Sequence, residues 1–130
     1  MILAYIDTSA ALKLAVPEAE STALVAALDG EPNRTLISSW LLHTELYCAA
    51  ERSPLRVKAN RLPAILNSIL LNDVTREDML KAGGLANLRA ADAIHLATAI
   101  RLRAEQMISY DNELLDAATK FGIAPVSPGL

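Results

Sequence analysis

The chain has 130 residues, 52% hydrophobic and 21% charged, which excludes an intrinsically disordered chain and predicts a single globular domain over residues 1–130. No apolar run approaches the ~20 residues that span a bilayer, and the N-terminus lacks a signal-peptide leader, so we expect a cytoplasmic protein without a membrane partner. Cys48, the single cysteine, excludes an internal disulfide and is expected to be a small core residue. The net charge of −3 excludes a general attraction to nucleic acid, which local basic patches would have to bind.

Short apolar runs alternate with helical patterns in the first half of the chain. Residues 2–6 contain no polar side chain, which is typical of a buried parallel strand, and residues 35–38 predict a second strand. The helical patterns, interrupted by proline and glycine, cover residues 10–15, 18–28, 40–52 and 55–69.

The same alternation continues to the end of the chain. Strands are predicted within residues 70–75, 106–109 and 123–126, and helices over residues 76–82, from 90 to about 104, and 111–121. Strands that alternate with helices predict an α/β fold with a parallel sheet covered by helices on both faces. We expect a three-layer sandwich with the strand order 3-2-1-4-5.

The helix that begins at residue 90 is apolar almost all round, which indicates a buried position. Asp92 stands near its start. An ionised carboxylate in the interior costs several kcal/mol unless it is paired, hydrogen-bonded or bound to a metal. Pairing with Arg89 and a favourable position at the helix N-terminus are the simplest explanations of Asp92.

Three more acidic residues occupy comparable positions. Asp7 directly follows the first predicted strand, Asp111 follows the fourth, and these strands are neighbours in the expected order. Ligands of such sheets bind beyond the carboxyl ends of the strands, where the strand order reverses. Glu45 shares a helix face with apolar residues and should point inward. We therefore expect Asp7, Glu45, Asp92 and Asp111 to converge on one pocket.

Local explanations of these acids stay open. Asp7 and Asp111 are good N-cap residues, and Glu45 could pair with Arg34 or another basic residue. Capping does not exclude a functional role, however. Four carboxylates that meet in a low dielectric repel one another unless a divalent cation neutralises them. Oxygen ligands of this kind suit Mg²⁺ or Mn²⁺ and are typical of phosphoryl chemistry.

Four segments carry a resemblance to a known family: residues 6–14 (IDTSAALKL), 44–46 (TEL), 89–99 (RAADAIHLATA) and 109–114 (SYDNEL). In order and spacing the chain resembles the PIN-domain ribonucleases, and in particular the VapC toxins of bacterial type II toxin-antitoxin pairs. The first and third segments are specific together, whereas the second is weak alone. The resemblance spans nearly the whole chain.

The resemblance implies a metal-dependent endoribonuclease that hydrolyses RNA phosphodiesters, serving as the toxin of a toxin-antitoxin system. The family's first, third and fourth acids correspond to Asp7, Asp92 and Asp111, which would hold Mg²⁺ directly or through water, with Mn²⁺ as a substitute. The second corresponds to Glu45, which would complete the site or orient the attacking water. The family's Thr-x-Asp pattern begins with Ser109 here and keeps its hydroxyl. A homodimer and a small cognate antitoxin are also implied.

Several polar residues near these acids are expected to support them. Thr8, Ser9 and Ser109 would be caps or ligand-orienting hydroxyls rather than nucleophiles, because the layout places no serine-histidine pair. His95 lies one turn after Asp92, and we expect a core position or one behind the acids.

RNA would have to be held by local basic residues. The candidates for phosphate contacts are Lys13, Arg52, Arg56, Lys58, Arg61 and Arg89. A solvated helix face is the competing interpretation for each of them. Trp40 and Tyr47, seven residues apart on one helix, favour core or dimer packing over base stacking.

Other functions fit the residues less well. A non-catalytic α/β protein-binding module, in which the acids are helix caps and ion pairs, is the main alternative. A phosphatase of the haloacid dehalogenase type needs a second Asp where Ser9 stands. A receiver-like signalling domain needs a Lys after the fourth strand, where Tyr110 and Asp111 stand instead.

Overall fold

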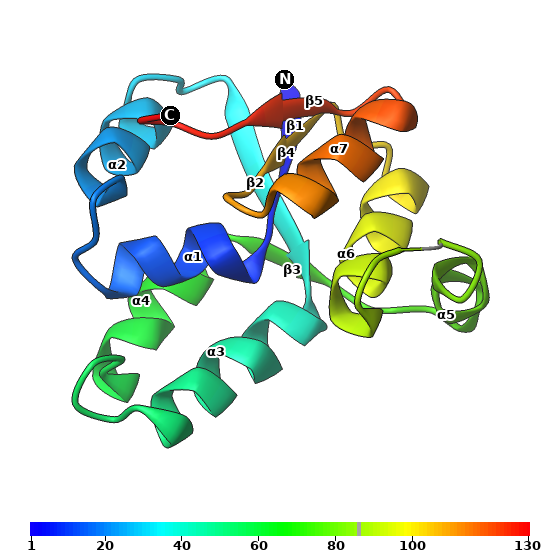
Figure 1. Cartoon of the computed structure of the whole chain (residues 1–130). Helices are drawn as coiled ribbons and strands as arrows, with labels where there is room; N and C mark the ends of the chain where they lie inside the picture. Colours follow the sequence, from blue (N-terminus) through cyan, green and yellow to red (C-terminus); the bar gives the residue numbers. More distant parts are fainter. Residues whose placement is uncertain (86) are drawn as a thin grey trace.

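The computed structural model describes residues 1–85 and 87–130, which form a five-stranded parallel sheet in the order β3-β2-β1-β4-β5 (Figure 1). The strands are β1 (Ile2–Ile6), β2 (Arg34–Ser39), β3 (Leu70–Asn72), β4 (Gln106–Ile108) and β5 (Ala124–Val126). The last residues of β1 and β4, Ile6 and Ile108, stand opposite each other. The predicted fold class and strand order are confirmed.

Helices cover both faces of this sheet. They are α1 (Thr8–Ala15), α2 (Ser21–Asp29), α3 (Trp40–Arg52), the 3₁₀ turn η1 (Ala59–Arg61), α4 (Leu62–Asn67), α5 (Arg76–Ala82), α6 (Ala90–Arg101) and α7 (Asn112–Lys120). In Figure 1, α1 to α4 lie on one side of the sheet and α5 to α7 on the other. The result is the three-layer sandwich that the sequence predicted.

The central strand β1 supplies side chains to both layers. Ala4 and Ile6 pack into the core beneath α1, α2, α3 and α4, whereas Tyr5 packs into the core beneath α6 and α7. Side chains along a strand alternate between the two faces of the sheet, so an apolar run without polar residues can be buried on both sides. Asp7 directly follows this run and therefore lies at the carboxyl end of the sheet.

Several predicted boundaries differ from the structure. The helix predicted over 55–69 is wrong for its first part, because a turn precedes η1 and α4 begins only at Leu62. Pro63 explains the start of α4, since proline lacks an N–H and is tolerated in the first helical turn. The helix predicted from residue 18 starts at Ser21, and α6, predicted to about residue 104, ends at Arg101.

The prediction that Cys48 is a core residue is wrong: α3 buries Leu42, Leu46 and Ala49, and Cys48 lies exposed on its outer face.

Among the described residues, no helix combines the length and the apolar character needed to cross a membrane.

Candidate active site

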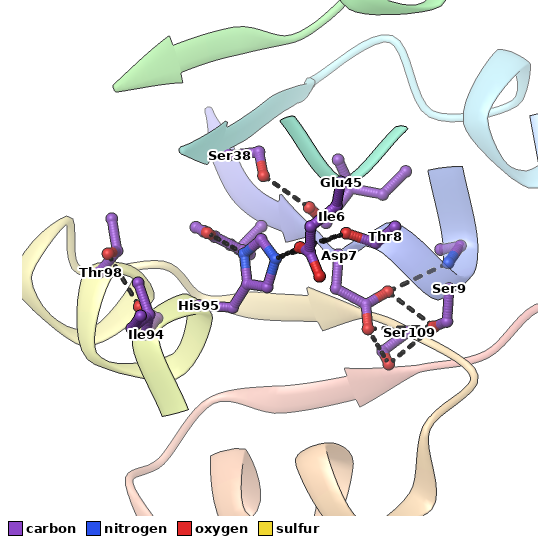
Figure 2. Close-up of polar contacts among 12 residues, drawn as sticks. Ile6, Asp7, Thr8, Ser9, Ser38, Glu45, Ile94, His95, Thr98 and Ser109 are labelled. Carbon is purple, nitrogen blue, oxygen red and sulfur yellow. Dashed lines mark hydrogen bonds and ion pairs between the residues drawn. The ribbon is translucent and has the colours of Figure 1, made fainter. Parts of the chain in front are cut away.

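Asp7 is the most enclosed of the four predicted acids. It is 2% exposed, and it caps the N-terminus of α1 by accepting a hydrogen bond from the Ala10 N–H (3.1 Å). The Ser9 hydroxyl donates to Oδ1 (2.8 Å) and the Ser109 hydroxyl to Oδ2 (2.7 Å), as Figure 2 shows. Burial raises the pKa of Asp7, although the bonds from Ser109, Ala10 and Ser9 oppose it. Asp7 is therefore fixed in position and poorly compensated in charge.

The two serine hydroxyls also connect Asp7 to the loop after β4. The Ser109 Oγ accepts the backbone N–H of Asp111 (3.0 Å), and the Ser9 Oγ accepts that of Tyr110 (2.9 Å). The Asp111 carboxylate caps α7 by accepting two backbone N–H groups of its first turn, at 3.0 and 3.2 Å. These bonds link the start of α1 to the start of α7, and they account for Ser9 and Ser109 as supporting hydroxyls of this corner.

Asp92 lies in the first turn of α6 and faces other carboxylates. Its pKa is raised to about 6, first by burial and then by the charges of Asp111 and Asp7. Among the described residues no ion pair to Asp92 is found, and Arg89, which is exposed, does not neutralise it. The pairing with Arg89 that would explain Asp92 as a structural residue is therefore not present. Asp7, Asp92 and Asp111 form one cluster of negative charge, the aspartate cluster.

Glu45 projects from α3 and is held by two hydrogen bonds. The Thr8 hydroxyl donates to Oε1 (2.6 Å), and the His95 Nε2 lies 2.5 Å from the same oxygen. Burial alone would raise the pKa of Glu45, but the hydrogen bonds from His95 and Thr8 and the charge of Arg52 outweigh it and lower that pKa. Arg34 does not pair with Glu45, because it contacts Gln106 and the Ala27 carbonyl instead. Glu45 is therefore an ionised carboxylate with an oriented Oε1.

These residues fit a divalent cation in their chemistry. Carboxylate oxygens are the ligands that Mg²⁺ and Mn²⁺ prefer, and the mutual repulsion in the aspartate cluster is what a cation relieves. In residues 1–85 and 87–130, no group of three or more His, Cys, Asp or Glu side chains is already arranged to hold a metal ion. This is compatible with Mg²⁺, which keeps several of its waters and needs only one or two direct carboxylates.

The predicted RNA-binding residues divide into two groups. Some are engaged within the protein: Lys13 pairs with Glu20 (3.1 Å) and lies over the Tyr110 ring, and Arg56 pairs with Glu18 (3.3 Å). Arg61 donates to the Ala15 carbonyl (3.4 Å). The remaining members, Arg52, Lys58 and Arg89, are exposed.

Sequence reasoning missed one residue next to this site and left another undecided. Tyr5 is completely buried, and its hydroxyl lies 2.6 Å from the His95 Nδ1. A tyrosine in an otherwise aliphatic strand was the available signal, since a buried phenol needs a hydrogen-bond partner. His95, itself 1% exposed, lies behind Glu45 and contacts its Oε1 through Nε2.

A protein-family model matches most of the chain. The model described as the PIN domain matches residues 4–120, which include every predicted acid. The chain belongs to the PIN-domain family. The residues of the aspartate cluster and Glu45 all lie within the matched part of this PIN domain.

Curated relatives of this PIN domain are named ribonucleases. It is 38% identical over 133 residues to Ribonuclease VapC46 of Mycobacterium tuberculosis, an alignment that covers 98% of this chain and 99% of the relative. It is 35% identical over 134 residues to Ribonuclease VapC35 of the same species, with 96% of each chain covered. The resemblance to VapC-type PIN domains is confirmed over the full alignment.

Solved structures agree on the fold. VapBC2 from Rickettsia felis, solved bound to a DNA fragment from its promoter, superposes with a TM-score of 0.75 at 13% identity, over 96% of this chain and 98% of that chain. VapC20 of M. tuberculosis, described as a toxin that cleaves the sarcin-ricin loop, gives 0.74 at 14% identity, over 96% and 99%.

Proposed function

We propose that this chain is an endoribonuclease that hydrolyses RNA phosphodiesters with Mg²⁺, with Mn²⁺ as a substitute, and that it is the toxin of a toxin-antitoxin pair acting in the cytoplasm. One observation carries the proposal. Asp92 faces Asp111 and Asp7 without an ion-pair partner among the described residues, and its pKa is raised first by burial and then by these two aspartates. The names of the curated VapC relatives support the ribonuclease assignment.

Asp7, Asp92 and Asp111 would hold the cation, directly or through water. When bound, such a cation polarises a phosphodiester, stabilises the negative charge that develops on its oxygens and activates water. Asp7 is suited to this role because three hydrogen bonds from the protein fix both of its oxygens before any ligand arrives. Fixed ligands reduce the reorganisation needed when the charged substrate binds.

Glu45 would orient the water that attacks phosphorus or complete the cation site. Its pKa is lowered, so it is ionised at neutral pH and accepts a hydrogen bond from water. Both hydrogen bonds made to Glu45 by the described residues fall on Oε1, which leaves Oε2 for a ligand. Thr8 supports this function as a donor, and no covalent intermediate on a hydroxyl is required.

The proposed function also includes RNA and protein partners. The phosphates of RNA would be held by the exposed cations Arg52, Lys58 and Arg89, and by Lys13, Arg56 and Arg61 when RNA competes with their present partners. A cognate antitoxin is supported by the similarity to solved toxin-antitoxin complexes. We also propose that the chain acts as a single domain that forms a homodimer.

The direct test is RNA cleavage by the purified chain. We expect cleavage with Mg²⁺ or Mn²⁺, none with excess EDTA, and loss of activity in Asp7→Asn, which keeps the shape of the side chain. Asp29→Asn removes an equal charge from the exposed end of α2 and is expected to cleave like the wild type. Metal-independent cleavage, or full activity of Asp7→Asn, would exclude the proposed mechanism. A chain that neither cleaves RNA nor binds Mn²⁺ would favour the protein-binding module.

A further inference from the structure

A buried hydrogen-bond chain runs from β1 through α6 to Glu45. The Tyr5 hydroxyl lies 2.6 Å from the His95 Nδ1, and the His95 Nε2 lies 2.5 Å from the Glu45 Oε1. Tyr5 and His95 are 0% and 1% exposed, and their rings meet edge to face with centroids 5.6 Å apart. Because both imidazole nitrogens have protein partners, His95 does not need water or substrate to satisfy its ring.

The chemistry of the partners assigns the positions of the protons. An ionised carboxylate only accepts hydrogen bonds, so the His95 Nε2 carries a proton and donates to Glu45. A neutral ring then has a lone pair at Nδ1, and the phenol of Tyr5 donates to it. The Tyr5 hydroxyl therefore donates to the His95 Nδ1, and the His95 Nε2–H donates to Glu45. The partner that fixes one nitrogen of an imidazole ring determines whether the other nitrogen donates or accepts a hydrogen bond.

This series of hydrogen bonds joins the segments that supply Asp7, Glu45 and Asp92. Tyr5 lies two residues before Asp7 on β1, and His95 lies one turn after Asp92 on α6. Glu45 comes from α3, in the opposite helical layer. In Figure 2 the His95 ring and the Thr8 hydroxyl approach the Glu45 carboxylate from its two sides. Both donors are thus placed to fix the rotation of that carboxylate relative to Asp7 and Asp92.

We propose that His95 is a positioning residue for Glu45, and that Tyr5 holds the other ring nitrogen so that the Nε2–H stays directed at the Oε1 atom. This inference rests on the proposed ribonuclease function and deepens it. His95 has no part in proton transfer to the substrate. It holds one oxygen of Glu45 so that the other is presented toward the aspartate cluster. Removal of such supporting hydrogen bonds typically costs about 10- to 100-fold in metal affinity or activity.

The first experiment needs neither RNA nor metal. Long-range ¹H–¹⁵N spectra of the imidazole rings report which nitrogen carries the proton, and the chain contains only two histidines to assign. His43→Gln identifies the His95 signals. We expect a protonated Nε2 and an unprotonated Nδ1 in the wild type, and in Tyr5→Phe a changed ¹⁵N chemical shift of Nδ1, because that nitrogen loses its hydrogen-bond donor. A His95 ring protonated at Nδ1 alone would overturn the inference.

The second experiment compares RNA cleavage and Mn²⁺ binding in three variants. We expect His95→Phe, which preserves a ring but no N–H, to lose about 10- to 100-fold in kcat. His95→Gln, which keeps an N–H near the Nε2 position, should recover part of this loss. A role in packing alone would give the reverse order. Thr98→Val removes a buried hydroxyl one turn along α6 and is the matched control, expected to cleave like the wild type.

The outcomes separate the two proposals. Wild-type-like cleavage and Mn²⁺ binding by His95→Phe would overturn the positioning role while leaving the ribonuclease function intact. If the wild type cleaves no RNA under any metal condition, the proposed function fails, and the tautomer spectra then decide the role of His95 by themselves. Thermal unfolding of each variant, measured alongside, identifies any variant whose loss of activity is a loss of fold.

Discussion

The two ends of α6 hold carboxylates in opposite electrostatic conditions. At the start of the helix, Asp92 faces Asp7 and Asp111, and its pKa is raised to about 6. At the other end, Asp78 of α5 is 2% exposed and accepts hydrogen bonds from the Arg101 Nε at 2.9 and 3.1 Å. Burial alone would raise the pKa of Asp78, but the bonds from Arg101 and Thr75 outweigh burial and lower it.

The difference separates a carboxylate with a structural role from one that we propose binds a cation. Asp78 completes a capping box with Thr75, receives the Thr98 hydroxyl (3.3 Å) and pairs with Arg101, so its charge is used entirely in joining α5 to α6. Asp92 lies among like charges and has no ion pair among the described residues. Natural folds retain such repulsion mainly where a ligand compensates it, which is why perturbed carboxylates indicate functional sites.

The largest effect is expected at Asp92. Asp92→Asn should lower kcat for RNA cleavage by at least about 100-fold, because it removes a negative charge that a bound cation needs. Its unfolding midpoint should stay unchanged or rise, since the repulsion within the aspartate cluster is reduced. Both quantities are measured on the same preparation, by cleavage of a fluorescent RNA and by thermal unfolding.

Asp116→Asn is the control for Asp92→Asn, because it removes the same charge from the exposed surface of α7. Wild-type protein and this control should both be stabilised by Mn²⁺ through mass action, by about 1.4 kcal/mol at ten times the dissociation constant. Asp92→Asn should gain less. An equal gain in all three proteins would separate Asp92 from cation binding and contradict its assignment.

Asp78→Asn is the same chemical change in α5, in the carboxylate that pairs with Arg101 at the other end of α6. It should have the opposite outcome. The free energy of unfolding should fall by about 2 kcal/mol, because charge-assisted hydrogen bonds to Arg101 are lost in a buried position. RNA cleavage well below the unfolding temperature should match the wild type. Urea unfolding and initial cleavage rates test the two statements, and reduced cleavage by a fully folded Asp78→Asn would erase the distinction between the two carboxylates.

The sequence was sufficient for the arrangement that brings Asp7 and Asp111 together. Both residues directly follow apolar strands, and the alternation of strands and helices restricts the sheet to few orders, so their adjacency follows from topology. The capping roles of these two residues were also predicted, because capping depends on local backbone geometry.

Contacts that depend on how separate helices pack could not be predicted in the same way. The partner of Glu45 is His95, 50 positions further along the chain, whereas the sequence offered Arg34 or another basic residue. The inward face of α3 was recognised, but Cys48 was assigned to it wrongly, because small residues fit either face of a helix. Likewise the compensation of Asp78 by Arg101 depends on the docking of α5 against α6.

The smallest prediction concerns pH and the paired carboxylate. Because the pKa of Asp78 is lower in the folded chain than its ordinary value of 3.8, its ionised form stabilises the fold at neutral pH. This stabilisation is present above the ordinary value and is lost as the pH falls through the lower folded pKa. The difference in unfolding free energy between wild type and Asp78→Asn should therefore be constant from pH 7 to about 5 and shrink below pH 4. A urea series over this range measures it, and a difference that grows on acidification would contradict the pairing with Arg101.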